Sequence, residues 1–340
     1  MAVSILELAV WLLTILAGCE LFSNGIEWAG KKMKLGEGAV GSVLAAVGTA
    51  LPETMVPIMA LLFGRGEKSI EVGVGAIAGA PFMLSTLAFM ITGVAVLVYA
   101  GMGRRTREMR ADAEVIGRDI RYFLIVYFIA VVVVTLDTHD QPWTHVLRYL
   151  TAAFLLGAYG YYVYRTFRNP GEHGGDIKEL HLARLFRLDM HSRHIAVQVL
   201  IGLGLIILGA HEFVRVVEHV SELIGVSALV LSLIITPIAT ELPEKMNSVL
   251  WTRNWKDTLA LGNITGAMVF QSCIPVALGV ALVHTWHLHD EAVASAILAL
   301  ASAGVTYLVL KVRKRFSPWA LLSGGVFYAL FMIYVFAIPH

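Results

Sequence analysis

Two short acidic motifs lie 191 residues apart in strongly apolar stretches of this chain. Residues 48–53 read Gly-Thr-Ala-Leu-Pro-Glu, and residues 239–244 read Ala-Thr-Glu-Leu-Pro-Glu. A carboxylate near the centre of a lipid bilayer costs about 3 kcal/mol, so it is usually paired, protonated or bound to a cation. Because the threonine, proline and glutamate recur at matching positions, the two motifs predict a pathway for ions across a membrane.

The proline of each motif adds backbone oxygen to this chemistry. Proline inside a helix has no N–H to donate, so the carbonyl four residues earlier loses its helical partner. Hard cations such as Ca²⁺ take about six to eight oxygen ligands. We therefore predict a Ca²⁺ site built from the carboxylates of Glu53 and Glu244, the hydroxyls of Thr49 and Thr240, and the carbonyls of Gly48 and Ala239. The alternative is that both glutamates are protonated, buried groups that hold helices together.

The composition places these motifs in a membrane protein. Of the 340 residues, 57% are hydrophobic and 15% are charged, and the mean hydropathy is +0.73. A helix needs about 20 apolar residues to cross a bilayer. The apolar runs predict an all-α integral membrane protein with ten transmembrane helices, at residues 3–22, 38–63, 70–99, 120–136, 145–166, 194–216, 224–250, 257–283, 291–310 and 318–337.

The chain also divides into two similar halves. Five helices in each half is an odd number, so the second half enters the membrane from the opposite side. Inverted repeats of this kind are typical of secondary transporters, whose binding site lies at the membrane midplane between the halves. The predicted domains are residues 1–167 as the first repeat (motifs at 48–53 and 75–84), residues 168–193 as a cytoplasmic linker, and residues 194–340 as the second repeat (motifs at 239–244 and 262–271).

Basic residues indicate the orientation of the chain in the membrane. Of the 26 lysines and arginines, 21 fall in the loops after the first, third, fifth, seventh and ninth predicted helices or within two residues of these loops. By the positive-inside rule these loops face the cytoplasm, and both termini face away from it. The residues before Cys19 resemble a lipoprotein cleavage site, but no basic residue precedes them as a signal peptide requires. We expect the inner (plasma) membrane of a prokaryote as the location.

The motifs resemble the two alpha repeats of the calcium/cation antiporter superfamily, particularly its sodium/calcium exchanger branch. That family pairs Gly-Thr-Ser-x-Pro-Glu in one helix with Gly-Asn-x-x-Gly-Ser-Asn-x-x-Asn or Asp in the next. The second pattern appears here at residues 262–271 and, more weakly, at 75–84. The resemblance implies that Ca²⁺ is exchanged against Na⁺ by alternating access, with the first helix of each half sliding across a rigid core. It implies that Glu53, Glu244, Thr49 and Thr240 bind calcium.

The chain departs from the family pattern at positions that bind sodium in the family. The serine positions hold Ala50, Ala80, Glu241 and Ala267, and the terminal polar positions hold Leu84 and Gln271. Exchange of Ca²⁺ or another cation against H⁺ is therefore the alternative, because a buried glutamate with few donors around it holds a proton more readily. The polar side chains that remain as further candidates for ion binding are Glu241, Asn263 and Gln271.

Three further charged residues are candidates for modulating the site. Lys245 follows Glu241 by four residues, a helical spacing that suits an ion pair. We expect Lys245 to pair with this carboxylate rather than to occupy the ion site. Glu20 and Glu212 take equivalent places in the first helices of the two halves. Both are candidates for gating the entry of ions, and the alternative for Glu20 is that it pairs with a lipid-facing or loop cation.

Other functional classes fit the chain less well. His211 and Glu212 resemble the start of a zinc protease motif, but the fifth position, which requires histidine, holds Arg215. We therefore predict no enzyme, while a passive cation channel remains a remote alternative. The expected partners are Ca²⁺, a counter-transported monovalent cation and the lipid bilayer. No nucleic acid, cofactor or protein partner is expected.

Overall fold

The computed structural model describes residues 2–32, 53–136, 142–168, 180–181, 192–283 and 290–337, and every regular element within these ranges is a helix. Seven of the described helices are long and apolar enough to cross a bilayer. Two shorter apolar helices, Glu53–Phe63 and Ala228–Ile238, accompany them. The protein is thus an all-α integral membrane protein, as the composition predicts. The number of ten transmembrane helices stays a prediction.

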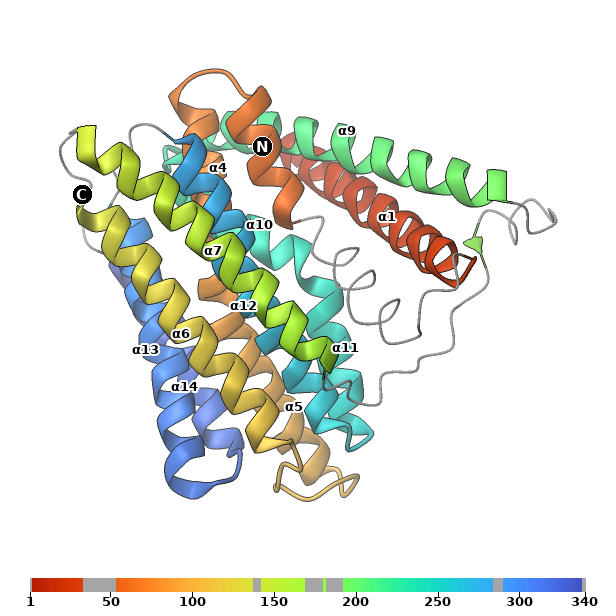
Figure 1. Cartoon of the computed structure of the whole chain (residues 1–340), viewed down its shortest axis with the longest axis vertical. Helices are drawn as coiled ribbons and strands as arrows, with labels where there is room; N and C mark the ends of the chain where they lie inside the picture. The colour runs from red at the N-terminus through yellow and green to blue at the C-terminus, as the bar shows by residue number, and fades with distance from the viewer. Residues whose placement is uncertain are drawn as a thin grey trace.

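The described helices occur along the chain in the following order (Figure 1). Up to the linker they are α1 (Ala2–Lys32), the π-helical turn η2 (Met59–Phe63), α4 (Glu67–Met83), the π-helical turn η3 (Leu84–Ala88), α5 (Phe89–Gly101), α6 (Ala113–Leu136) and α7 (Pro142–Arg168). After the linker they are α9 (Ser192–Ile224), α10 (Ala228–Thr240), α11 (Leu242–Arg253), α12 (Asp257–Leu282), α13 (Asp290–Arg313) and α14 (Pro318–Ala337).

The two longest helices, α1 and α9, lie side by side along one edge of the larger bundle (Figure 1). Glycines bring their backbones together. A Cβ atom on Gly18 would lie 2.9 Å from the carbonyl oxygen of Gly202, and one on Gly202 would lie 2.7 Å from the amide nitrogen of Phe22. Small residues allow this close approach in a membrane, where packing rather than the hydrophobic effect joins helices. The α1–α9 pair is therefore closely packed, and it shares a buried apolar cluster with η2, α4 and α10.

The centre of the bundle is formed by α4 against α10. Gly75 and Gly79 of α4 lie so close to the carbonyls of Leu229 and Leu233 in α10 that no Cβ atom would fit. The Ser232 hydroxyl of α10 donates a hydrogen bond to a backbone carbonyl of α4 at 2.7 Å. α12 contacts α4 and also packs against α6 and α7. The helices that carry the second part of each motif therefore lie inside the bundle.

One predicted helix is two helices in the structure. The run 224–250 is divided into α10 and α11, which meet at Glu241. The apolar run does not reveal this break, because leucine and isoleucine continue up to the motif on one side of it. Of the predicted helix 38–63, the structure describes residues 53–63, which are helical.

A second predicted boundary is also wrong. α6 begins at Ala113 rather than at residue 120. The Asp112 carboxylate accepts hydrogen bonds from the backbone amides of Glu114 at 2.9 Å and Val115 at 3.1 Å. These bonds cap the helix N-terminus, so two polar turns can precede the apolar run. A prediction based on the apolar run alone misses these turns.

Candidate ion-binding site

The second acidic motif lies where α10 ends and α11 begins. α10 ends at Thr240, Glu241 has φ −91° and ψ 3°, and α11 starts at the next residue. Pro243 lies in the first turn of α11, where an amide has no helical partner in any case. The Glu241 amide donates to the Pro237 carbonyl at 3.1 Å, and the Lys245 amide donates to the Glu241 carbonyl at 3.1 Å. Broken helices of this kind form binding sites in membrane transporters.

A buried ion pair spans this break. Lys245 Nζ lies 3.1 Å from Glu241 Oε2, and the two residues are only 7% and 1% exposed. Lys245 Nζ also donates a hydrogen bond to the Pro237 carbonyl at 3.3 Å. The predicted pair between Lys245 and Glu241 is therefore confirmed. A cation that binds the Glu241 carboxylate has to compete with the lysine.

Two of the predicted ligands are buried in the bundle. Glu53 is 5% exposed and begins the Glu53–Phe63 helix. Thr240 is 1% exposed, and its hydroxyl donates to the Thr236 carbonyl at 3.0 Å. Because this bond uses the hydroxyl proton, the lone pairs of the Thr240 oxygen remain available for a cation. Both side chains have the environment that an intramembrane ion ligand needs.

Other predicted ligands fall outside the part of the chain that the structure describes. Gly48 and Thr49 precede the first described residue of their helix. Ala239 lies in the last turn of α10 and Glu244 in the first turn of α11, and their side chains are also outside the description. Their roles as ligands stay predictions.

α12 carries two polar side chains of the second motif, Asn263 and Gln271. They are separated by about 12 Å along the helix axis. Asn263 Nδ2 and Gln271 Oε1 are buried, and neither makes a hydrogen bond within the described part of the protein. A buried polar atom without a partner costs about 1–3 kcal/mol. The unpaired amide oxygen of Gln271 is a ready ligand for a cation.

A π-helical turn interrupts the corresponding helix of the first half. η3 follows α4 directly, after Pro81, at the end of the weak motif 75–84. The Ser85 hydroxyl donates to the Pro81 carbonyl at 2.8 Å, and the Ser302 hydroxyl of α13 donates to the Ser85 carbonyl at 2.5 Å. π-helical turns are frequent at functional sites. In the sequence, Pro81 and Ser85, four residues later, are the signal for this π-helical turn.

The two candidate gating glutamates each contact a basic side chain. Glu20 Oε1 lies 3.1 Å from His181 Nε2, and Glu212 Oε2 lies 3.1 Å from Arg215 Nη1. Their side chains are 58% and 24% exposed, respectively. The Glu20 contact is the pairing that was the alternative to gating, and the partner of Glu212 lies in its own helix. Their role in ion entry stays a prediction.

A buried carboxylate that the motifs do not identify lies on α6. Asp119 is 3% exposed, pairs with Arg118 at 3.1 Å, and accepts a hydrogen bond from the Thr265 hydroxyl at 3.2 Å. Thr265 belongs to the motif 262–271 on α12. The apolar run from residue 120 onward leaves Asp119 in a predicted loop, so only the correct start of α6 places it inside the bundle.

A membrane-embedded helical bundle with a broken motif helix and buried carboxylates defines a class of protein, the secondary transporters of cations. The chain belongs to the sodium/calcium exchanger protein family, whose model matches residues 3–168 and 194–338. This confirms the family that the two motifs indicate. The protein is therefore a membrane cation exchanger and not an enzyme.

Relatives of similar length occur in bacteria. Inner membrane protein YrbG of Escherichia coli (strain K12) is 23% identical over 302 residues, which cover 87% of this chain and 86% of the relative. The putative antiporter CaxA of Alkalimonas amylolytica is 24% identical over 319 residues, which cover 92% of each chain.

Solved structures of exchangers share the fold. The H⁺/Ca²⁺ exchanger CAX matches with a TM-score of 0.73 at 15% identity, over 99% of this chain and 82% of that chain. The sodium-calcium exchanger NCX_Mj matches with a TM-score of 0.57 at 19% identity, over 100% of both chains. At these identities the likeness establishes the fold alone.

Proposed function

We propose that the protein exchanges Ca²⁺ against Na⁺ across a membrane by alternating access. The carboxylates of Glu53 and Glu244 neutralise the divalent ion in this proposal. The remaining oxygens come from the hydroxyls of Thr49 and Thr240 and the carbonyls of Gly48 and Ala239, with Glu241, Asn263 and Gln271 as further polar groups. The ions are cargo, and no resident cofactor takes part.

The break between α10 and α11 is the observation that carries this proposal. It places Thr240 and Glu241, each 1% exposed, at a helix end inside an apolar bundle. On α12, the buried Gln271 Oε1 lacks a hydrogen-bond partner among the described residues. A buried amide oxygen without a hydrogen-bond partner is satisfied by a cation, and the carboxylates of the motifs supply the charge that a divalent ion needs.

The α1–α9 pair supports alternating access. The pair packs through its own glycines and lies along one edge of the bundle. In the proposed cycle it slides across the core formed by α4, α10 and α12, and so opens the site to one side of the membrane at a time. The site itself stays fixed in the core.

Exchange of Ca²⁺, or another cation, against H⁺ is the second candidate function. Alanines at positions 50, 80 and 267 remove hydroxyls at positions that bind sodium in the family. A solved structure with the same fold is an H⁺/Ca²⁺ exchanger, and another is a sodium-calcium exchanger. Because both couplings occur on this fold, the choice between them has to be made by experiment.

We also propose how the chain lies in the membrane. The basic loops face the cytoplasm, both termini face away from it, and the host membrane is a prokaryotic inner membrane. The two halves, residues 1–167 and 194–340, have inverted orientations and are joined by the linker at 168–193. The Escherichia coli relative is an inner membrane protein by name, which supports this location.

Transport in proteoliposomes tests the proposal. Purified protein is reconstituted, and Ca²⁺ uptake is measured under an imposed Na⁺ gradient or an imposed pH gradient, with the membrane potential clamped. Uptake driven by Na⁺ supports the proposal, whereas uptake driven only by H⁺ selects the second candidate. Ca²⁺ flux without movement of any counter-ion would identify a channel instead.

Two variants tie the transport to the site. Glu53→Gln removes a proposed ligand and should abolish exchange, because one carboxylate no longer neutralises the divalent ion. Glu67→Gln is the matched control, since Glu67 is an exposed glutamate near the same hairpin turn. Retained exchange in Glu53→Gln would overturn the site assignment.

A further inference from the structure

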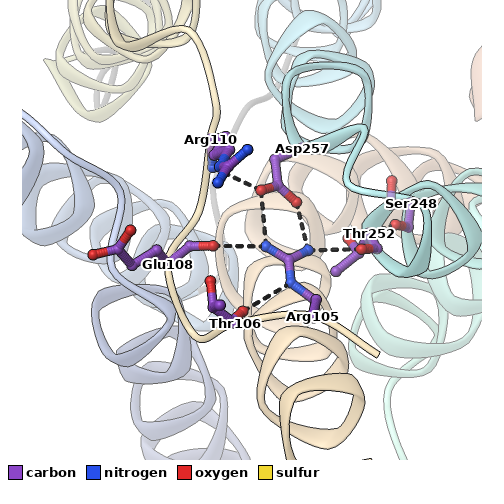
Figure 2. Close-up of polar contacts among 7 residues, drawn as sticks. All are labelled: Arg105, Thr106, Glu108, Arg110, Ser248, Thr252 and Asp257. Carbon is purple, nitrogen blue, oxygen red and sulfur yellow. Dashed lines mark hydrogen bonds and ion pairs between the residues drawn. The ribbon is translucent and has the colours of Figure 1, made fainter. Parts of the chain in front are cut away.

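A fully buried arginine fastens the loop between α5 and α6 (Figure 2). The Arg105 guanidinium makes two parallel hydrogen bonds to Asp257, at 2.7 and 2.8 Å, and both side chains are 0% exposed. It also donates to the carbonyls of Thr106 at 3.1 Å, Thr252 at 2.6 Å and Glu108 at 2.9 Å. We call this arrangement the Arg105–Asp257 clamp. It uses the whole planar fork of donors that distinguishes arginine from lysine.

The clamp joins three elements at one point. Asp257 is the first residue of α12, and Thr252 lies in the last turn of α11. Arg110, in the loop between α5 and α6, donates its backbone amide to Asp257 Oδ2 at 2.7 Å. The loop, the end of α11 and the start of α12 are therefore held together, as Figure 2 shows.

The turn between α11 and α12 depends on the same arginines. Trp255 in this turn has a φ of 61°, a backbone region that side chains other than glycine rarely adopt. The guanidinium carbons of Arg105 and Arg110 each lie 4.9 Å from the centre of the Trp255 ring. Cations over an indole face are attracted to it. These contacts hold the turn in its strained conformation.

The other end of this helical hairpin carries proposed ion ligands. Glu244 on α11 lies about 12 Å from the clamped end of its helix, and Asn263 lies about 9 Å from Asp257 along α12. Between these points, the Ser248 hydroxyl of α11 donates to the Ala260 carbonyl of α12 at 3.0 Å. The position of α11 along the axis of α12 is thus fixed at the clamped turn and at the Ser248 contact.

We infer that Arg105 and Asp257 are positioning residues for the second half of the ion site. They set the height of α11 against α12, so that groups from both helices meet the same cation. This inference rests on the proposed exchanger function. Ca²⁺ binds oxygen at about 2.3–2.6 Å, so a small slip between the helices weakens coordination. The clamp itself does not touch the ion, so its loss should lower affinity rather than stop the transport cycle.

Variants that keep the protein folded can test this role. Arg105→Met/Asp257→Leu replaces the ion pair by apolar side chains of similar volume, a change that often leaves stability unchanged or higher. Arg105→Lys keeps the charge but loses the planar fork. Arg107→Met is the matched control, because Arg107 is an exposed arginine of the same loop.

The measurement is Ca²⁺/Ca²⁺ self-exchange in proteoliposomes over a range of Ca²⁺ concentrations, with thermal unfolding as the test of folding. Self-exchange needs the ion site and alternating access but no coupling ion. In the double variant we expect the half-saturating Ca²⁺ concentration to rise about tenfold, while the maximal rate stays within about threefold of wild type. Arg105→Lys should show a smaller rise, and Arg107→Met should match wild type.

Other outcomes overturn the inference. A folded double variant whose half-saturating concentration stays within about twofold of wild type would leave the clamp a purely structural feature. If the double variant does not fold, Arg105→Lys decides in the same way. Wild-type protein without any self-exchange would instead refute the proposed function. In that case calorimetry measures Ca²⁺ binding to the same variants. A dissociation constant of the double variant equal to that of wild type would overturn the inference.

Discussion

Each motif lies on a pair of consecutive helices: the Glu53–Phe63 helix and α4 form the first hairpin, and α11 and α12 form the second. In the turn of each hairpin one residue has a positive φ, but the residue type differs. Between the Glu53–Phe63 helix and α4, Gly66 has a φ of 89° and nothing lies within 4 Å of where a Cβ atom would be. Between α11 and α12, Trp255 has a φ of 61° beneath two arginines. Glycine adopts such a backbone without steric cost, whereas tryptophan does not. The first turn is therefore independent of its neighbours, and the second needs them.

The ion pairs that attach the two hairpins to the rest of the bundle also differ, because one is exposed and the other is buried. In the first, Lys68 of α4 pairs with Glu222 of α9 at 2.5 Å, with side chains 49% and 56% exposed. In the second, the clamp between Arg105 and Asp257 is fully buried. Exposed ion pairs contribute little to stability, whereas removing one partner of a buried pair strongly destabilises the protein. The first hairpin thus contacts α9 through this exposed pair and through the buried Ser69 hydroxyl, which donates to Glu218, whereas the second is fixed to the core by a fully buried ion pair.

Removing one side of the clamp should have the largest effect. Asp257→Leu strands the Arg105 charge in a dry site, so the free energy of unfolding should fall by about 3–5 kcal/mol. Chemical unfolding in detergent measures this loss. Adding Arg105→Met to the same chain should restore most of the stability. Equal stability of the single and double variants would mean that the unpaired Arg105 charge reaches water, which would contradict a water-free clamp.

Changing the glycine of the first turn should have the next largest effect. Gly66→Ala forces a side chain into a backbone region with φ 89° and ψ −179°, which should destabilise the protein by about 1–3 kcal/mol. Gly101→Ala is the control, because this position is also open but helical, with no positive φ. A stability equal to that of the control would mean that the turn relaxes to another conformation.

The reverse change in the second turn should have a smaller effect on stability. Trp255→Gly relieves the backbone strain but removes the stacking of Arg105 and Arg110, each contact being worth about 0.5–1 kcal/mol. Because these effects oppose each other, the net change should stay below about 1 kcal/mol. The same unfolding experiment measures it. If Trp255→Gly lowered the free energy of unfolding more than Gly66→Ala does, the stacking of the arginines would matter more than the backbone strain.

Breaking the exposed pair should have the smallest effect. Lys68→Gln removes the contact with Glu222 and should leave the unfolding temperature unchanged, because water replaces the lost partner. The rate of exchange should change by no more than about twofold, with a larger change at low salt. Arg65→Gln is the control, since Arg65 is exposed near the same turn. A clear drop in unfolding temperature would contradict the contrast between the two hairpins.

Much of the fold can be predicted from apolar runs, because a helix satisfies its own backbone hydrogen bonds in lipid. The last predicted helix, 318–337, coincides with α14. The break at Glu241 is not predictable in this way, since a proline can either kink a helix or begin a new one. The early start of α6 depends on the cap made by Asp112, which lies outside the apolar run.

The site is predictable only where residue types repeat. The motifs identify Glu53 and Thr240, and both are buried. The clamp has no such signal, because Arg105 and Asp257 are 152 residues apart. In the sequence, Arg105 is one of six basic residues that follow the third predicted helix, and it serves only to orient the chain. Nothing local distinguishes the one that folding buries.

The close contact of α4 with α10 has a consequence for energy conservation. Where Gly75 and Gly79 meet the carbonyls of Leu229 and Leu233, the backbones leave no room for a methyl group, and therefore none for a water molecule. Ions cannot cross such a dry seam. In the proposed exchange cycle this seam closes one route for leakage, so the membrane potential and the stored gradients are not dissipated there.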